Sequence, residues 1–235
     1  MTAYSIRVES LNSLLKTGWK EVVRLPVLVF PIRFYGIINH TLHLKLVSLL
    51  VAAVARCFYF FLFGWRKKKK RDGVEIKRVH ELDEQFDLFW EKAISLYPIM
   101  GVRDRKYLNW RYLKHPTRNY AIYRAFWKEE MKGYIVLRKV ELLDFNSSVI
   151  VDLLALDGEI LHELVEKGIE HSMREGTDLL GFMVPRPHPY YQSLRRKGFL
   201  PSLKTFHFLV YSHGKEERLF DPKGWYVTWG DTDVI

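Results

Sequence analysis

The pattern of apolar and polar positions divides the chain into three regions. Residues 1–36 begin with leucines at helical spacing, stop at Gly18, and continue into a valine- and leucine-rich stretch that predicts a β-strand. Pro26 interrupts this stretch, and because proline cannot donate to a sheet ladder, it predicts a strand at a sheet edge. Residues 37–71 are apolar over most of their length and end in a basic run. In residues 72–235, segments whose apolar residues have helical spacing alternate with segments whose pattern is that of a strand.

The third region predicts a mixed α/β domain. Two strands around a Lys-Glu-Glu turn predict an antiparallel hairpin, and the run Val149–Leu156 is apolar enough for a central strand. The expected strands are residues 74–78, 120–127, 132–140, 149–156, 179–184, 204–211 and 225–229. The expected helices are residues 81–97, 104–112, 159–175 and 190–197. This order predicts an α/β fold with a mixed, mostly antiparallel central sheet flanked by helices, preceded by an N-terminal apolar linker helix.

The apolar part of the second region, residues 46–65, is long enough to span a bilayer. Its one charge, Arg56, costs on the order of 3 kcal/mol near the bilayer centre, which the leucines, valines and phenylalanines roughly offset. Four positions nevertheless fall on one narrow helical stripe: Lys45, Ser48, Ala52 and Arg56. Such a stripe is typical of a helix in the membrane interface or in a groove of the protein. A spanning helix, an interfacial helix and a buried linker helix therefore all stay open.

Six consecutive basic residues, Arg66–Arg71, directly after this apolar run, carry over half of the net charge of +10. A basic run beside an apolar helix is typical of contact with an anionic membrane surface, and a solvated linker is the alternative. Nucleic-acid-binding proteins more usually spread their basic residues over a face, which argues against a nucleic-acid partner. If the helix enters a membrane, the tract marks the cytoplasmic side. The expectation is a cytoplasmic domain, attached to or associated with a membrane through residues 44–71.

Few side chains suit a metal ion. The single cysteine, Cys57, excludes a disulfide within the chain and a cysteine-based metal site. The histidines show no metal-ligand spacing and receive no role. Asp231 and Asp233 beside Gly230 are too few acids for a calcium loop. We therefore expect no metal.

An offset of 180 residues aligns two short segments of the chain. Ser13–Trp19 corresponds to Ser193–Phe199, and in both cases a strand rich in valine, leucine and phenylalanine follows a glycine stop. We expect the match to reflect shared ancestry, with residues 1–36 as the remnant of an earlier copy. A generic helix-to-strand corner is the alternative explanation.

A series of motifs resembles the GCN5-related N-acetyltransferase (GNAT) superfamily. The stretch Arg103–Tyr112, followed by His115-Pro116, resembles an RD-x-x-YL-x-WRY…P signature of GNAT-like proteins with two tandem acyltransferase halves. Val149–Leu154 resembles their central strand, Arg196–Phe199 their helix-to-strand corner, and Trp225–Asp233 their ending. The resemblance implies three parts: residues 1–36 from a first half, a linker at 37–71, and a GNAT-like second half at 72–235. It implies acetyl-CoA as donor and a small-molecule or peptide amine as acceptor.

The resemblance also implies where acetyl-CoA would bind. In GNAT domains, a Gln/Arg-x-x-Gly-x-Gly/Ala loop after the central strand presents backbone amides to the pyrophosphate. The corresponding segment here has one glycine, no arginine and two acids, Asp157 and Glu159, which helix capping also explains. The cofactor-binding candidates are Leu154, Leu156, Gly158 and Ile160.

The resemblance assigns the general acid to a tyrosine four residues before the Gly-Phe corner, where this chain has Leu194. Tyr190 and Tyr191, one turn earlier, are the catalytic candidates in its place, and packing within the helix is their alternative role. Asp152 is a third candidate, because a carboxylate in a central strand needs a partner or an open cleft. It belongs either to a structural ion pair or to a substrate site. The substrate-binding candidates are Arg103, Tyr107, Trp110 and Arg111.

Three functions stay open from the sequence. The first is an acyltransferase of the N-acetyltransferase type, which moves an acyl group from acyl-CoA to an amine. The second is a catalytically degenerate, membrane-associated half-domain with a binding or regulatory role. The third is a FemAB-like transferase that uses aminoacyl-tRNA, for which the basic tract is the one supporting feature.

Overall fold

The computed structural model describes residues 1–5, 7–42, 45–63, 72–214 and 216–232. Arg66–Arg71 and Asp233 lie outside these residues, so what the sequence predicts of them stays a prediction. The strands are β1 (Thr2–Ser5), β2 (Lys20–Pro31), β3 (Val74–Val79), β4 (Ile99–Met100), β5 (Ala121–Trp127), β6 (Glu130–Leu142), β7 (Phe145–Ala155), β8 (Leu179–Met183), β9 (Leu200–Val210) and β10 (Trp225–Tyr226). The helices are α1 (Val8–Lys16), α2 (Phe34–Leu42), α3 (Lys45–Phe63), α4 (Gln85–Ala93), α5 (Arg105–Leu108), α6 (Gly158–Arg174) and α7 (Pro189–Lys197).

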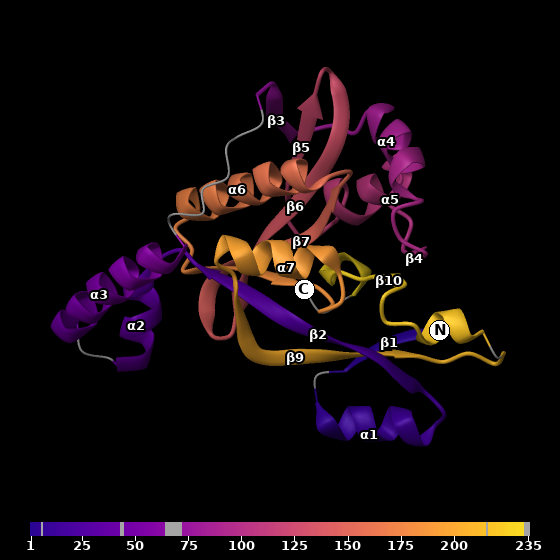
Figure 1. The fold of residues 1–235 in the computed structure, drawn as a ribbon, viewed down its shortest axis with the longest axis horizontal. Coiled ribbons are helices and arrows are strands. Elements are labelled where there is room, and N and C mark those ends of the chain that lie inside the picture. Colours follow the sequence, from indigo (N-terminus) through magenta and orange to yellow (C-terminus); the bar gives the residue numbers. More distant parts are fainter. Residues whose placement is uncertain (6, 43–44, 64–71, 215, 233–235) are drawn as a thin grey trace.

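Eight of the strands form one twisted sheet in the order β1-β9-β2-β8-β7-β6-β5-β3 (Figure 1). Within this sheet, as far as the structure describes it, β7 and β8 are parallel and every other neighbouring pair is antiparallel. A separate short ladder joins β10 to β4. The sheet is therefore mixed and mostly antiparallel, as the sequence predicts.

Helices cover both faces of the sheet at its centre. Neighbouring residues of a strand point to opposite faces, and β6 shows this at Gly133 and Tyr134. A Cβ atom at Gly133 would meet Ile160 of α6, whereas the Tyr134 ring contacts Phe89 of α4. The β6–β7 pair is therefore the middle layer of an α/β/α arrangement.

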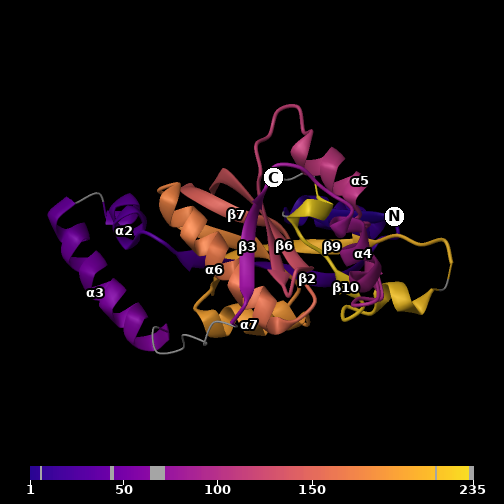
Figure 2. The ribbon, with the colours of Figure 1, turned by 90° about the horizontal axis from the view of Figure 1, so that it is seen from above.

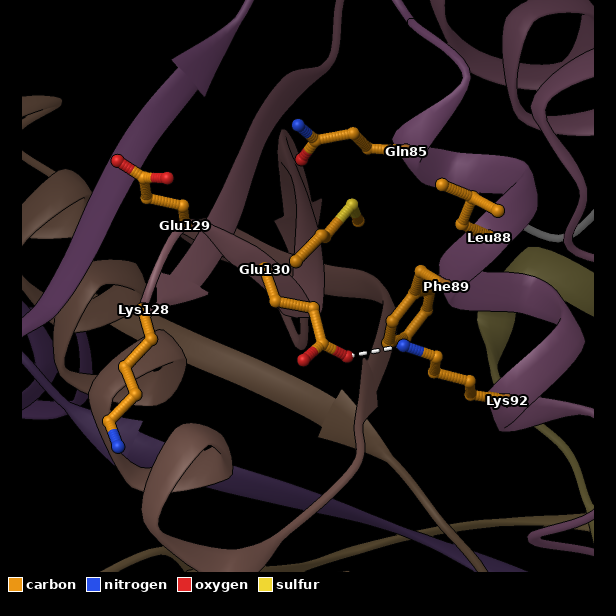
Figure 3. A pocket seen from close by; sticks show the side chains of 8 residues that line it. Gln85, Leu88, Phe89, Lys92, Lys128, Glu129 and Glu130 are labelled. Atoms are coloured by element: carbon orange, nitrogen blue, oxygen red, sulfur yellow. Dashed lines mark hydrogen bonds and ion pairs between the residues drawn. The ribbon is translucent and has the colours of Figure 1, made fainter.

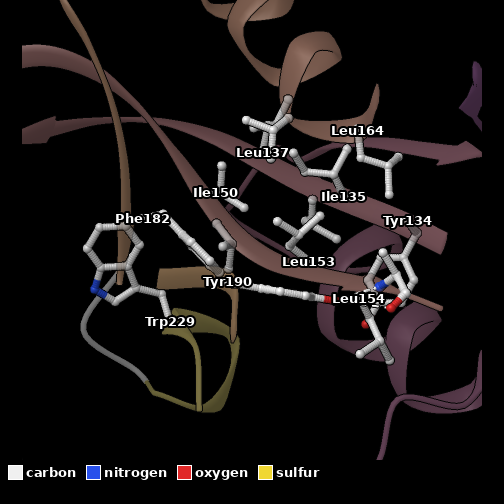
Figure 4. Packing of buried hydrophobic residues seen from close by; sticks show 14 of the residues in the cluster. Tyr134, Ile135, Leu137, Ile150, Leu153, Leu154, Leu164, Phe182, Tyr190 and Trp229 are labelled. Atoms are coloured by element: carbon white, nitrogen blue, oxygen red, sulfur yellow. Dashed lines mark hydrogen bonds between the residues drawn. The ribbon is translucent and has the colours of Figure 1, made fainter. Parts of the chain in front are cut away.

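The hydrophobic core lies along β6 and β7. Every residue of β7 from Ser147 to Ala155 is buried, which fits the predicted central strand. On the α6 side, apolar side chains of both strands and of the helix form one cluster, as Figure 4 shows for Ile135, Leu137, Leu153 and Leu164. Full burial of one such side chain stabilises the fold by about 1.5–3 kcal/mol.

Strand β2 lies inside the sheet, between β8 and β9, so the prediction of an edge strand is wrong. Its Leu25, Val27 and Leu28 are fully buried. The register against β9 shifts between Pro26 and Leu28. The proline is tolerated in an internal strand because a bulge removes the need for its missing N–H.

Two β-α-β units interdigitate at this end of the sheet. β1-α1-β2 and β8-α7-β9 each lead from a strand through a helix into a longer strand, and each unit places one strand of the other between its own two. The helices of both units end at glycines in the left-handed region, Gly18 (φ 90°) and Gly198 (φ 109°). If the two units are exchanged, so that β1 takes the place of β8 and β2 that of β9, the strand order β1-β9-β2-β8 is the same when read in the opposite direction. Shared ancestry stays a prediction, but residues 72–235 alone lack two strands of the sheet.

Some predicted elements are shorter than expected. The predicted helix 81–97 is α4, Gln85–Ala93, because the chain must leave helical geometry before Pro98. The predicted helix 104–112 begins at the Asp104 cap as α5 and continues as a π-helical turn over Asn109–Leu113. The predicted strand 225–229 is β10 followed by a 3₁₀ turn that a capping box starts at Thr228.

The apolar second region forms the helical pair α2–α3, which projects from one end of the sheet (Figures 1 and 2). Ser48 and Ala52 face the protein and are buried, whereas Arg56 is exposed. The Tyr59 hydroxyl donates to the carbonyl of Gly198 at 2.8 Å, which fixes the end of α3 at the α7–β9 corner. Among the residues that the structure describes, no helix is long and apolar enough to cross a membrane.

Replacing Leu28 by alanine tests whether β2 is part of the core. Leu28→Ala should destabilise the protein by about 3 kcal/mol, because it removes fully buried methyl groups between two strands. The matched control is Leu203→Ala, since Leu203 in β9 is 105% exposed. Chemical denaturation followed by circular dichroism measures both. Equal stability of the two variants would contradict the internal position of β2.

Candidate functional site

The two parallel strands separate at the centre of the sheet. β7 pairs with β8 from Ser147, opposite Leu179, to Ile150, opposite Phe182. Beyond this point β7 continues to Ala155, while β8 ends at Met183. Crevices at the carboxyl ends of neighbouring strands are where open α/β sheets bind ligands. The diverging ends of β7 and β8, followed by the N-termini of α6 and α7, are therefore the candidate site.

Two tyrosine side chains fill the space between the diverging strands. The backbone N–H of Ala155 donates to the Tyr190 hydroxyl at 2.9 Å, and this hydroxyl donates to the Ala155 carbonyl at 3.2 Å. The Tyr226 hydroxyl donates to the Leu153 carbonyl. Buried backbone groups need partners, and these two phenols supply them where β8 no longer does. Burial raises the pKa of Tyr190 well above its usual value, so the phenol keeps its proton.

An aromatic cluster holds these tyrosines. The rings of Tyr97 and Tyr226 stack with centroids 4.8 Å apart, and His188 lies 4.6 Å from Tyr97 and from Tyr190. His188 also caps α7, since its Nδ1 accepts from the backbone N–H of Tyr190. Burial lowers the pKa of His188 to about 3, so the ring is neutral at pH 7. Its Nε2 then carries the proton and has no hydrogen-bond partner among the described residues.

The N-terminus of α6 carries its own carboxylate. The side chain of Asp157 accepts from the backbone N–H groups of Glu159 and Ile160 at 2.9 and 2.8 Å, as the capping interpretation predicts. Ile160 is fully buried, and the N–H of Leu156 donates to the carbonyl of Lys132. With these amides engaged and a negative charge beside them, the loop does not fit the pyrophosphate of acetyl-CoA.

The position of Gly158 is more open, since a Cβ atom there would meet nothing within 4 Å. The fourth cofactor candidate, Leu154, is fully buried on β7, where Figure 4 shows the Tyr190 ring pointing toward it. The four cofactor candidates thus lie around the same strand end. In this arrangement, side chains of the protein itself occupy the space and the hydrogen-bonding groups that an extended ligand would need.

Asp152 belongs to a buried ion-pair cluster. Arg103 and Asp152 are each 1% exposed, with Nε 3.1 Å from Oδ1, and Arg103 also binds Asp231 at 2.7 Å. Tyr134 and Tyr112 donate to the other oxygen of Asp152 at 2.8 and 3.3 Å. Burial raises the pKa of Asp152, and the Arg103 guanidinium opposes this shift.

The cluster connects β7 to the C-terminal segment. Besides binding two carboxylates, Arg103 donates a hydrogen bond to the carbonyl of Gly101 at 2.7 Å. Its guanidinium also lies 5.1 Å from the centre of the Tyr226 ring. Removing Arg103 would leave the carboxylate of Asp152 buried without a cation, which costs about 3–5 kcal/mol. The geometry favours the structural ion pair over a substrate role for Asp152 and Arg103, because neither is accessible.

The remaining substrate candidates lie on α5 and on the π-helical turn that follows it. The Tyr107 hydroxyl donates to the carbonyl of Gly230 at 3.3 Å, and Arg111 donates to the carbonyl of Thr232, so both hold the C-terminal segment. Trp110 is 65% exposed and lies beside Tyr107. It stands on the π-helical turn, a feature that is frequent at functional sites.

Two surface hollows lie away from the strand ends. One, of about 300 Å³, lies between α4 and the β5–β6 turn and is shown in Figure 3. Phe89 forms part of its floor, and the ion pair of Lys92 with Glu130, at 2.5 Å, crosses its rim. The other, of about 530 Å³, is lined by residues 78–84 together with Arg105 and Arg124. None of the residues predicted for the site lines either hollow.

The sequence makes Tyr190 and Asp152 candidates, but it does not indicate the aromatic residues around Tyr190. Tyr97, His188 and Tyr226 are far apart in the sequence, and each alone reads as an ordinary packing residue. Tyr191, the other catalytic candidate, is half-buried on α7 outside this cluster. Within the described residues, no group of three or more potential ligands could hold a metal ion.

The sequence matches no protein-family model and none of the curated proteins. Solved structures do match the fold. A GCN5-related N-acetyltransferase from Anabaena variabilis aligns over 88% of this chain and 45% of its own length, with 12% identity and a TM-score of 0.51. A probable N-acyltransferase of unknown function from Enterococcus faecalis aligns over 88% and 44%, with 12% identity and a TM-score of 0.55.

A conserved protein of unknown function from Staphylococcus epidermidis aligns over 87% of this chain and 68% of its own, with 10% identity and a TM-score of 0.50. The chain spans less than half of the length of the Anabaena and Enterococcus proteins. It has the fold of the GCN5-related N-acetyltransferases, an acetyltransferase-like fold. At these identities the likeness shows the fold alone.

The buried His188 makes stability depend on pH. The unfolded chain binds a proton at His188 near pH 6.5, whereas the folded chain does so near pH 3. Between these pH values the folded state loses stability as the pH falls. The contribution of this residue to the free energy of unfolding is about 2 kcal/mol lower at pH 5 than at pH 7. His188→Asn keeps an acceptor at the helix cap and removes the titration.

Urea denaturation at pH 7 and pH 5 measures the difference. The other histidines are common to both proteins, so the wild type should lose about 2 kcal/mol more than His188→Asn over this range. An equal loss in the two proteins would show that His188 is not held neutral in the folded state.

Proposed function

We propose that this chain is an acyltransferase-type half-domain with a binding or positioning role, in which acyl transfer is not carried out at the β7–β8 site. The observation that carries this proposal is the Tyr190 hydroxyl, which engages both backbone groups of Ala155 at the end of β7. A donor that entered between the strands would have to displace the Tyr190 ring and the aromatic cluster around it.

Electrostatics at the neighbouring helix supports the same proposal. Asp157 neutralises the positive end of the α6 dipole and takes the amides of the first turn. Glu159 adds a second acid in this turn. A diphosphate would meet two negative charges in place of free donors, so acetyl-CoA is disfavoured on grounds of charge as well as space.

The fold relatives suggest where transfer would take place. Because the chain aligns with less than half of the Anabaena and Enterococcus proteins, the chemistry in such proteins can belong to a part with no counterpart here. In this proposal, the present half supports a second acyltransferase unit that holds acyl-CoA. The aminoacyl-tRNA alternative rests on the basic tract, which lies outside the described residues.

In this proposal an amine acceptor, which is a small molecule or a peptide, binds to this chain at Trp110. A protonated amine is attracted to the face of an exposed indole, and Trp110 is 65% exposed on the π-helical turn that follows α5. Tyr107 beside it is anchored to the C-terminal segment, which keeps the turn in place. Binding of the acceptor without turnover is the role that this arrangement supports.

Donor binding by the full-length chain tests the proposal. We expect no heat of binding in calorimetry and no shift in thermal unfolding with millimolar acetyl-CoA. A ligand present at a hundred times its Kd would stabilise the fold by about 2.7 kcal/mol, which thermal unfolding readily detects. A saturable isotherm with one acetyl-CoA per chain would contradict the proposal.

Two variants test whether Tyr190 is the group that closes the site. Tyr190→Ala empties the space between the strands, and Tyr191→Ala is its matched control on the same helix. Enhanced binding in Tyr190→Ala alone is the result that closure by Tyr190 predicts. Equal binding in both variants would show that Tyr190 does not close the site.

A further inference from the structure

Helix α3 has a face of exposed apolar side chains, whose contact with water is unfavourable. Of the twenty large apolar side chains that are exposed in the described residues, eight belong to this helix. They are Leu46, Leu49, Leu50, Val51, Val54, Phe58, Phe61 and Leu62. Leu46 is 80% exposed and Phe61 is 71% exposed, so both ends of the helix take part. Isolated exposed apolar residues are normal, but a continuous face of them marks an interaction surface.

The polarity of α3 is the reverse of that of a surface helix in water. Its narrow inward stripe contains Ser48, which is fully buried, and Ala52, followed at helical spacing by residues 55, 59 and 63. The other side chains of the helix that the structure describes are exposed. Among those outward positions that the structure describes, Arg56 is the one charged residue, and it lies beside the inward stripe. The small inward face packs on the protein, and the wide outward face is left without a partner.

The base of α3 is firmly attached. Besides its hydrogen bond to Gly198, Tyr59 contacts the rings of Phe30 and Phe34 at 5.8 and 5.4 Å. The rest of the helical pair extends away from the sheet, as both views show (Figures 1 and 2). With 19 residues, α3 is about 28 Å long. The apolar face is therefore exposed on a helix that is attached to the rest of the protein near its C-terminal end.

The charge of this part of the chain indicates the partner. Residues 22–71 contain ten basic residues and no acidic one, and the rest of the chain has 27 of each. The whole net charge of +10 thus belongs to the segment that contains α2 and α3. In the sequence, Arg66–Arg71 follow α3 after only two residues, Gly64 and Trp65. Basic clusters beside an apolar helix are attracted to anionic lipid headgroups, by about 1 kcal/mol per basic residue near the surface.

We propose that α3 binds an anionic lipid bilayer, lying in the interface with its outward face at the boundary of headgroups and acyl chains. A protein partner would require a polar rim with hydrogen-bonding groups around the apolar centre. The outward face of α3 offers one charged side chain over its described positions, which suits acyl chains better. This inference is independent of the proposed function, since it concerns a surface far from the β7–β8 ends.

Vesicle co-sedimentation of the full-length chain tests the proposal. The probes are vesicles of phosphatidylcholine alone and vesicles that also contain phosphatidylglycerol. We expect binding to the anionic vesicles and at least a roughly tenfold weaker affinity for the neutral ones. Replacing Lys67, Lys68, Lys69 and Lys70 by glutamine should weaken anionic binding by roughly a hundredfold or more.

The apolar contribution is tested by Leu50→Gln/Val54→Gln. Both side chains are exposed, so the fold should be unchanged by circular dichroism, while affinity for anionic vesicles falls about tenfold or more. The matched control, Met173→Gln/Leu203→Gln, changes two exposed apolar residues on α6 and β9 and should bind like the wild type.

Three results would overturn the proposal. One is a chain that sediments with neither kind of vesicle, and another is equal affinity of Leu50→Gln/Val54→Gln and wild type. The third is a stable dimer in light scattering that Leu50→Gln/Val54→Gln converts to monomer without any vesicle binding. In that case the outward face of α3 pairs with a second copy of the chain.

Discussion

The arrangement of the candidate site depends on one constraint, the need of the last backbone groups of β7 for partners after β8 has diverged. A strand in the middle of a sheet cannot leave its N–H and C=O groups unpaired without destabilising the fold. Tyr190 meets this need at Ala155 and Tyr226 meets it at Leu153. The same bonds that complete the sheet thus close the place where the fold would accept a ligand.

This closure draws on distant parts of the chain. Tyr226 is held in position because Arg103 and Asp152 tie the C-terminal segment to β7. Tyr190 is positioned by α7, whose unit is interdigitated with the N-terminal β1-α1-β2 unit. Residues from both ends of the chain therefore stabilise one closed strand end. The projecting α3 lies outside this network, which leaves its outward face available for another task.

The sequence predicted what local patterns determine. The hairpin, the central strand, the glycine helix ends and the Asp157 cap follow from periodicity and capping chemistry within a few residues. Asp152 was expected to need a partner or an open cleft because an apolar strand surrounds it. The internal position of β2 was not predicted, because a bulge at Pro26 overrides the usual meaning of proline. Pairings between β2 and β9, or between Tyr190 and Ala155, join residues far apart, and no local pattern encodes them.

Amide hydrogen exchange at Ala155 tests the central claim most directly. If the Tyr190 hydroxyl accepts from this N–H, NMR of the wild-type chain should show a slowly exchanging Ala155 amide without any ligand. In Tyr190→Phe the ring stays and the acceptor is lost, so the same amide should exchange faster while the neighbouring core amides of β7 keep their protection. A rapidly exchanging Ala155 amide in the wild type would contradict the account.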